Sequence, residues 1–211
     1  MNVIIQDSTL RDGNHAIRHQ LGSEDVASYC RAAELAGIPI LEVGHGNGLG
    51  ASSLQVGFVK IKDEQMLKIA RQNLNNTRLA VHVMPGFATI ERDLRPALDI
   101  GVDIVRVGTH CTEADISERH VQFAAKNGVE VVGSLMMSHM VDKHRLLEEA
   151  KKFQDYGASG VSLYDSAGSY LPAEVKEKIS FLVENLKIKV GFHAHNNLGM
   201  AIANSIAAVN A

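Results

Sequence analysis

The stretch EVVGSLMMSHMVDKHRLLEEAKKFQDYGASGVSLY, residues 130–164, decides the fold class. It opens on a short apolar run with β-branched residues, EVVGSLM (130–136), which is typical of a buried strand. An amphipathic segment of helical spacing follows, HRLLEEAKKFQDYG (144–157), and ends on a glycine. A second apolar run, GVSLY (160–164), completes a strand–helix–strand unit. Two strands joined by such a crossover run parallel.

The same unit recurs along the chain. Seven short apolar runs are predicted as strands: VIIQD (3–7), IPILEV (38–43), LAVHVM (79–84), DIVRVG (103–108), EVVGSLM (130–136), GVSLY (160–164) and KVGFHAH (189–195). Between them lie amphipathic segments, the first from Ser23 to Gly37, with Ser23 as the expected N-cap. Glycines stand just before a strand, where a helix end favours a left-handed residue, at Gly37, Gly101, Gly128 and Gly157.

Seven strand–helix units in succession predict an α/β protein, either a doubly wound open sheet or a TIM (β/α)8-type barrel. The even spacing and the lack of a G-x-G-x-x-G turn after the first strand favour the barrel. We therefore expect one catalytic barrel domain over residues 1–211, with seven β/α units and without the eighth strand and C-terminal helical segment. Open edges at the first and last strands indicate either a truncated chain or an edge covered by another subunit.

Composition argues against several classes of protein. The 211 residues carry a formal net charge of -3, with Lys and Arg spread along the chain, so neither a nucleic-acid-binding surface nor a membrane-surface helix is indicated. The first ten residues lack the basic and apolar regions of a signal peptide. No apolar run approaches the roughly 20 residues that span a bilayer. Cys30 and Cys111 make no disulfide framework, and two free thiols fit a cytoplasmic protein.

Polar and ionisable residues gather where the predicted strands end. In a barrel of this type, the loops after the strands build the active site. These loops are DSTLRDGNH (7–15), GHGNG (44–48), MPG (84–86), THCTE (109–113), MMSH (136–139), DSAG (165–168) and HAHNN (193–197). We expect the active site at this end of the barrel.

His193 and His195 are candidate metal ligands. Side chains alternate along a strand, so both imidazoles point to the same side. A carboxylate from the loop after the first strand, Asp7 or Asp12, is expected as the third ligand. Two imidazoles and one carboxylate suit Mn²⁺, Mg²⁺, Fe²⁺, Co²⁺ or Zn²⁺ in a Lewis-acid role. The alternative is a pair of histidines that merely hydrogen-bond to their neighbours.

Arg11 and His15 flank Asp12 and offer two further roles. Arg11 would hold a developing oxyanion in an enolate-forming reaction, or it is a plain ion-pair partner of Asp12. His15 would be a general base near neutral pH, or a solvent-exposed loop histidine. The exposed-loop interpretation is the stronger one for His19.

Other polar residues of the predicted loops have weaker indications. The segment GHGNGLG (44–50) permits close approach of the backbone to a ligand, but it lacks the Lys-Ser/Thr of a phosphate loop. Ser166 either contacts a substrate carboxylate or belongs to a turn that caps a helix. His110, Cys111 and His139 are expected to be packing residues.

Six stretches together resemble one known family: DSTLRDGNHAIRHQ, HGNGLGASS, GTHCTEAD, LMMSHM, YDSAG and HAHNNLGMAIANSIAAV. They are similar, in order over the whole chain, to the metal-dependent 4-hydroxy-2-oxovalerate aldolases. That group belongs to the DRE-TIM metallolyases, with hydroxymethylglutaryl-CoA lyase and isopropylmalate synthase. The TLRDG core is shared across the superfamily, whereas the following NHAIRH resembles the pyruvate-specific aldolases.

The resemblance implies a role for each candidate residue. The metal ligands would be Asp12, His193 and His195, with Mn²⁺ the expected ion and Mg²⁺, Co²⁺ or Zn²⁺ as alternatives. Arg11 would stabilise the enolate, His15 would be the catalytic base and Ser166 would contact the substrate. The implied reaction is retro-aldol cleavage of a 4-hydroxy-2-oxoacid to pyruvate and an aldehyde, through an enolate held by metal and arginine.

The family extends beyond this sequence with an eighth strand and a C-terminal helical segment, which carries a tyrosine near the active site. That segment also makes much of the contact with an acylating acetaldehyde dehydrogenase, so pairing with this partner is in doubt for these 211 residues. An oligomer is expected. Two alternatives stay open: another DRE-TIM carbon–carbon lyase or synthase, of the HMG-CoA lyase or isopropylmalate synthase type, and a non-catalytic metal- or metabolite-binding partial barrel.

Overall fold

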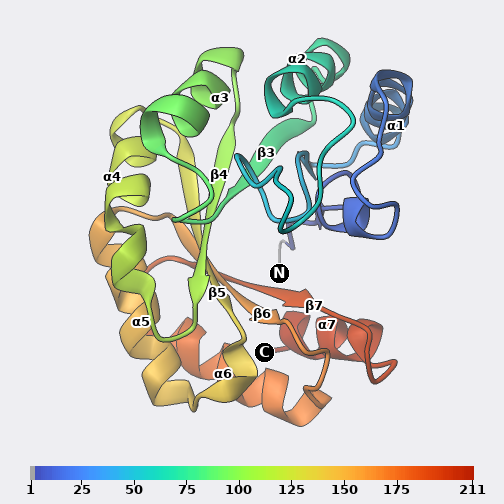
Figure 1. The fold of residues 1–211 in the computed structure, drawn as a ribbon. Helices are drawn as coiled ribbons and strands as arrows, with labels where there is room; N and C mark the ends of the chain where they lie inside the picture. The colour runs from blue at the N-terminus through green and yellow to red at the C-terminus, as the bar shows by residue number, and fades with distance from the viewer. Residues whose placement is uncertain (1–2) are drawn as a thin grey trace. The chain divides into compact units, whose positions relative to one another are not determined.

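The computed structural model describes residues 3–211, in which strands and helices alternate along the chain (Figure 1). The chain divides into two compact units, Met1–Arg106 and Val107–Ala211. The boundary falls inside strand β4, Ile104–His110. Strands follow one another in the sheet in chain order, β1 to β7, which confirms the predicted class of parallel β/α fold. The expectation of a single domain over residues 1–211 stays a prediction.

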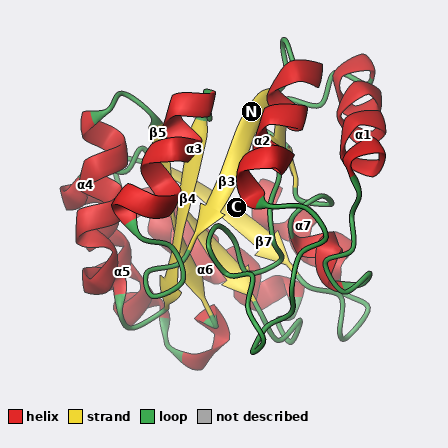
Figure 2. Ribbon diagram, turned by 45° about the horizontal axis from the view of Figure 1, so that its top comes forward, coloured by secondary structure: helices red, strands yellow, loops and turns green. Residues whose placement is uncertain are grey.

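The first unit contains three parallel strands besides the start of β4. They are β1 Gln6–Asp7, β2 Ile40–Glu42 and β3 Arg78–Val83. The helical elements between and after them are the 3₁₀ helix η1 Asp12–His15, α1 Ser23–Leu35, α2 Asp63–Asn73, the π-helical turn η2 Ile90–Leu94 and α3 Arg95–Ile100. Helices α1 and α2 pack against each other. Figure 2 shows these helices in red and the strands in yellow.

Two local predictions for the first unit are wrong. The predicted strand 3–7 shrinks to Gln6–Asp7, because β2 has only three residues and its register provides partners for Gln6 and Asp7 alone. The apolar side chains of Val3, Ile4 and Ile5 are instead 51–63% exposed. The N-cap of α1 is Gly22 rather than Ser23, and the Gly22 N–H donates to the Asp25 carboxylate at 2.7 Å.

The second unit contains β5 Glu130–Met136, β6 Gly160–Asp165 and β7 Lys189–Ala194, which pair in parallel. Its helical elements are η3 Ala114–Ser117, α4 Glu118–Lys126, η4 Ser138–Met140, α5 Lys143–Tyr156, α6 Pro172–Asn185 and α7 Ala201–Val209. Helix α5 packs on both β5 and β6, while α6 and α7 pack on β7. The strand–helix–strand unit predicted over residues 130–164 is confirmed.

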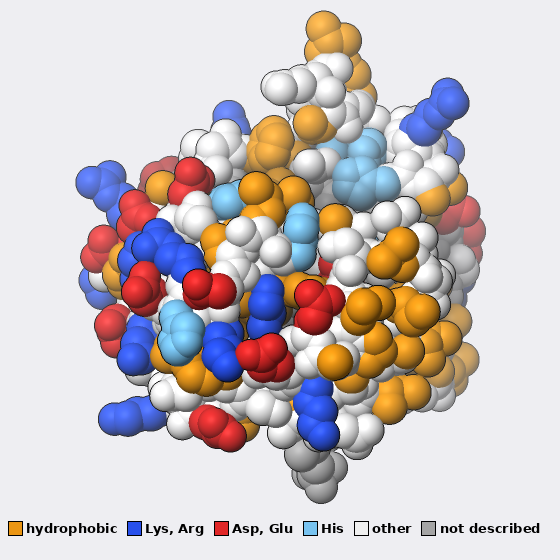
Figure 3. Space-filling model, turned by 90° about the horizontal axis from the view of Figure 1, so that it is seen from below, with side chains coloured by type: hydrophobic (Ala, Val, Ile, Leu, Met, Phe, Trp, Pro, Cys, Tyr) orange, Lys and Arg blue, Asp and Glu red, His pale blue; other side chains and the backbone are white. Residues whose placement is uncertain are grey.

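Neighbouring strands of this unit differ sharply in burial. All six residues of β6 are buried, whereas none of the six residues of β7 is fully buried although each pairs with β6. Helix α7 is also incompletely covered, with Ile202 77% and Ile206 57% exposed. Apolar side chains gather on the right of the face seen in Figure 3, where Figure 1 draws α7. The β7–α7 unit is therefore incompletely covered.

The glycines at the C-terminal ends of the helices lie where the sequence predicts them. Gly101 and Gly157 cap α3 and α5 in the left-handed region, with φ of 97° and 104°. Gly37 and Gly128 lie one residue beyond the caps of α1 and α4, also with positive φ. Cys30 and Cys111 are buried free thiols. Within residues 3–211, no helix has the length and apolar character needed to cross a membrane.

Candidate active site

Arg11 is the centre of a buried ionic network in the first unit. It directly precedes η1, and only 4% of its surface is exposed. Its Nη1 donates to Asp12 Oδ1 at 2.9 Å and to the Gly46 carbonyl at 3.2 Å, while its Nε donates to Glu42 Oε1 at 3.2 Å. The ion pair with Asp12 is thus one of three contacts of Arg11, and together with those to Glu42 and Gly46 it fixes the plane of the guanidinium.

Glu42 belongs to the same network, and the sequence alone did not single it out. Its side chain on β2 is fully buried and accepts hydrogen bonds from Gln6 Nε2 at 2.7 Å and Arg106 Nη1 at 2.8 Å, in addition to Arg11. His82 Nδ1 on β3 lies 3.8 Å from its Oε1. Glu42, His82 and Arg106 each lie inside one of the predicted apolar strands. A buried charge is stable only when it is paired, so these three residues were the available signal for a buried ionic network.

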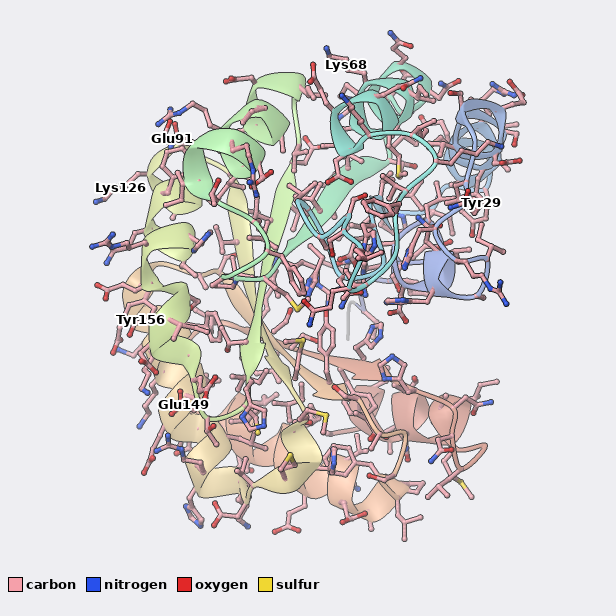
Figure 4. All side chains as sticks on the ribbon, in the orientation of Figure 1. Tyr29, Lys68, Glu91, Lys126, Glu149 and Tyr156 are labelled. Atoms are coloured by element: carbon pink, nitrogen blue, oxygen red, sulfur yellow. The ribbon has the colours of Figure 1, made fainter. Side chains whose placement is uncertain are left out.

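The structure distinguishes Asp7 from Asp12. Asp7 Oδ2 accepts the phenolic hydrogen of Tyr29 at 2.7 Å, and its Oδ1 accepts the backbone N–H of Thr9 at 2.7 Å. Tyr29 belongs to α1 (Figure 4), so Asp7 ties the turn after β1 to that helix. Asp12 lies beside Arg11 with 30% of its side chain exposed. Asp12 is therefore the better candidate for a ligand.

Three histidines of the first unit lie together. His15 is exposed at the end of η1, whereas His19 is 4% exposed and His45 fully buried. The expectation of an exposed His19 is wrong, because its ring stacks on the buried ring of His45 with centroids 3.7 Å apart. Burial, with the nearby His19 as a smaller cause, lowers the pKa of His45 to about 4. Both buried imidazoles are consequently neutral near pH 7.

His193 and His195 lie side by side in the second unit. Their ring centroids are 4.9 Å apart, as expected for alternate residues on one side of a strand. His193 pairs in register with Tyr164 of β6 and stacks on its ring at 4.4 Å. His195 directly follows β7, and its Nδ1 lies 2.9 Å from the Asp165 carbonyl. That hydrogen bond assigns the ring proton to Nδ1 and the lone pair to Nε2, an arrangement usual for ligating histidines.

Ser166 and its neighbours shape the loops next to the histidine pair. The Ser166 hydroxyl oxygen accepts the Met137 N–H at 2.9 Å and so anchors the loop after β5, where Met137 has a positive φ. The buried Asp165 carboxylate accepts two backbone N–H groups of the turn that follows β6. Cys111 Sγ donates to the Met137 carbonyl at 3.2 Å, and burial raises the pKa of this thiol, which opposes a nucleophilic role. Contact between Ser166 and a substrate stays a prediction.

Comparison with known proteins finds relatives that are named as aldolases. The 4-hydroxy-2-oxovalerate aldolase of Spirochaeta aurantia is 61% identical over 99% of this chain and 61% of its own length. The enzyme of the same name from Pectobacterium atrosepticum is 55% identical over 98% of this chain and 60% of its own length. The chain thus spans about three-fifths of the length of these curated relatives.

Two solved structures and one family model also match this chain. The N-terminal domain of a candidate aldolase from Bacteroides vulgatus superposes with a TM-score of 0.83 at 27% identity, over 99% of this chain and 69% of that one. The carboxyl transferase domain of Rhizobium etli pyruvate carboxylase shares the fold, with a TM-score of 0.84 at 20% identity, over 99% of this chain and 38% of that one. The model of the HMGL-like family matches residues 2–211, and the chain belongs to this family.

Proposed function

We propose that the protein is a divalent-metal-dependent, class II pyruvate aldolase. It would cleave a 4-hydroxy-2-oxoacid, such as 4-hydroxy-2-oxopentanoate, reversibly to pyruvate and an aldehyde. The observation that carries the proposal is the buried guanidinium of Arg11, held between the carboxylates of Asp12 and Glu42. A fixed, permanently charged donor of this kind suits the stabilisation of a developing oxyanion. The names of the curated relatives support the same reaction class.

Asp12, His193 and His195 would hold the metal ion. Each offers one ligand atom, and the set of one carboxylate and two imidazoles fits a divalent ion with positions left for water or substrate. The hydrogen bond from His195 Nδ1 to the Asp165 carbonyl supports ligation through Nε2. Mn²⁺ is the expected ion, and Mg²⁺, Co²⁺ and Zn²⁺ are the alternatives. When bound, the ion would supply Lewis-acid polarisation of the 2-oxoacid.

Arg11 and His15 would carry the charge and proton changes of the reaction. His15 would remove the proton from the C4 hydroxyl, after which the C3–C4 bond breaks and the aldehyde leaves. The electron pair of that bond passes into the pyruvate enolate, whose oxyanion would be stabilised by the Arg11 guanidinium. Transfer of a proton to C3 of the enolate would then give pyruvate. Glu42 holds the guanidinium in its plane, so that no reorganisation of Arg11 is needed as charge develops. Ser166 would contact the substrate carboxylate.

A pyruvate-release assay tests this function. Protein freed of metal by a chelator is mixed with 4-hydroxy-2-oxopentanoate and one of the four ions, and pyruvate is followed through lactate dehydrogenase and NADH. We expect turnover that requires a divalent ion and no acyl-CoA. The His15→Ala variant should lose about 10²- to 10⁴-fold in kcat, the usual contribution of a general base. His144→Ala is the matched control, because His144 is an exposed residue of α5.

Metal content tests the ligand assignment separately. We expect His193→Ala and Asp12→Ala to lose bound Mn²⁺ after dialysis, whereas His144→Ala keeps it. Unchanged metal content in both ligand variants would refute the assignment. Wild-type protein that binds Mn²⁺ but releases no pyruvate would favour the non-catalytic alternative, and turnover only with an acyl-CoA substrate would favour another DRE-TIM lyase or synthase. Pairing with an acylating aldehyde dehydrogenase, oligomerisation and a cytoplasmic location stay predictions.

A further inference from the structure

The ring of His15 rests on two buried histidine rings of the first unit. His19 and His45 stack with centroids 3.7 Å apart and an interplanar angle of 20°. His15 meets His19 edge to face at 4.9 Å, and its centroid is 6.4 Å from that of His45. The exposed ring of His15 therefore packs against the buried pair His19 and His45, to which the proposed chemistry assigns no role.

Hydrogen bonds to the backbone fix the buried pair. His45 Nδ1 accepts the Asn47 N–H at 3.0 Å, and its Nε2 lies 3.2 Å from the Gly57 carbonyl, to which it donates. His19 Nδ1 accepts the Gly46 N–H at 3.4 Å. Because both nitrogens of His45 are engaged by backbone groups, the three histidines are poorly suited to binding a metal ion. The pair is better understood as a rigid support.

Two glycines make room for this support. A Cβ added at Gly46 would overlap the ring of His15, so the imidazole would have to leave its present position. At Gly57, which has a φ of +100°, a Cβ would lie 2.8 Å from His19 Cδ2. Gly46 also accepts the hydrogen bond from Arg11 Nη1 through its carbonyl. One backbone residue thus connects His15, His19 and Arg11.

The backbone around His19 adopts a conformation that costs free energy. Arg18 and His19 have φ of 55° and 62°, in the left-handed region that L side chains rarely adopt. The conformation is held by hydrogen bonds from the His19 N–H to the Asn14 carbonyl at 2.8 Å and from the Lys60 N–H to the His19 carbonyl at 3.1 Å. Such a conformation persists only where the surroundings determine it, and such places cluster at functional sites.

We propose that His19 and His45 are positioning residues, whose stacked rings, together with Gly46, hold the His15 imidazole in one orientation for proton transfer. The inference rests on the proposed function, in which His15 is the base. Misplacement of a reacting group by about 1 Å can cost about 100-fold in rate. Loss of the support should therefore lower kcat while KM stays near the wild-type value, because the His19 and His45 rings are buried, at 4% and 0% exposure.

A double-mutant cycle tests this inference. His19→Ala should lower kcat by about 10- to 100-fold. His19→Phe keeps a ring of similar shape and should recover most of that loss, and His144→Ala should have no effect. In the His15→Ala background, His19→Ala should cause no further loss, because its effect acts through His15. Equal losses for His19→Ala in the two backgrounds, or equal losses for the Phe and Ala variants, would overturn the inference.

A measurement independent of activity separates this inference from the proposed function. Three-bond couplings across the Cα–Cβ bond of His15, measured by NMR, should report a single rotamer in the wild type and in His19→Phe. Averaged couplings are expected in His19→Ala and Gly46→Ala. If the wild type releases no pyruvate, the proposed function fails, while the couplings still decide whether His19 orients His15. Couplings that are unchanged in both the His19→Ala and Gly46→Ala variants would overturn the positioning role.

Discussion

The arginine network of the first unit and the histidine pair of the second unit are built in opposite ways. Arg11 and Glu42 are 4% and 0% exposed, and their charges are directed into hydrogen bonds with one another and with Arg106. His193 and His195 are only partly buried and lie at the end of β7, the strand without a fully buried residue. An oxyanion-binding group gains from rigid burial, whereas metal ligands must leave a lone pair accessible to the ion.

The largest expected effect is on stability, in the arginine network. Glu42→Ala would leave Arg11 and Arg106 buried without their shared carboxylate, and removing one partner of a buried pair costs about 3–5 kcal/mol. Urea denaturation should show that fall in the free energy of unfolding. His193→Ala, measured without metal, should change it by less than about 1 kcal/mol, since the ring is partly exposed. Equal losses in the two variants would remove the distinction between the two regions.

The next effect is on catalysis. Arg11→Lys keeps the positive charge but loses the fork that engages Asp12, Glu42 and Gly46 together. We expect kcat to fall by about 100- to 1000-fold, as for removal of one oxyanion donor. The stability loss should be smaller than in Glu42→Ala, because an ammonium still neutralises Glu42. A variant with wild-type kcat would show that the guanidinium plane is not required.

Acid should destabilise the first unit through His45. Its pKa is near 4 in the folded protein and 6.5 ordinarily, so the unfolded chain binds the proton first as the pH falls. Stability is therefore complete above about pH 6.5, falls between 6.5 and 4, and levels off below, with a loss of at most roughly 3 kcal/mol. Urea midpoints between pH 8 and 4 measure this slope. His45→Phe should flatten it, and an unchanged slope in that variant would exclude His45 as the cause.

The smallest expected effect is the stabilisation by metal, and it should depend on the second unit. Mn²⁺ at 100 times its dissociation constant stabilises a folded protein by about 2.7 kcal/mol. The wild-type Tm should rise accordingly on addition of Mn²⁺ and return after chelation. His195→Ala should show no such rise. A full rise in His195→Ala would place the ion elsewhere in the protein.

Sequence reasoning succeeded where the signal is local. The run Glu130–Met136 was predicted to the residue, because a continuous apolar run between polar junctions has one simple interpretation as a buried strand. The positions of Gly101 and Gly157 followed from the backbone geometry of helix ends. The prediction failed at residues 3–5, which have strand-like composition but no pairing partner in the short β2. Strand formation depends on a neighbour, and no local pattern contains that information.

The amino-acid sequence by itself determined the order of strands and helices, the common side of His193 and His195, and the candidates Arg11, Asp12 and His15. These follow from periodicity, from side-chain alternation and from the resemblance to known aldolases. Only the tertiary structure decided that Glu42 pairs with Arg11 and Arg106, and that His19 lies buried on His45. The reason is physical: each of these buried groups has its partner 26 to 64 positions away in the chain, and folding alone brings the two into contact.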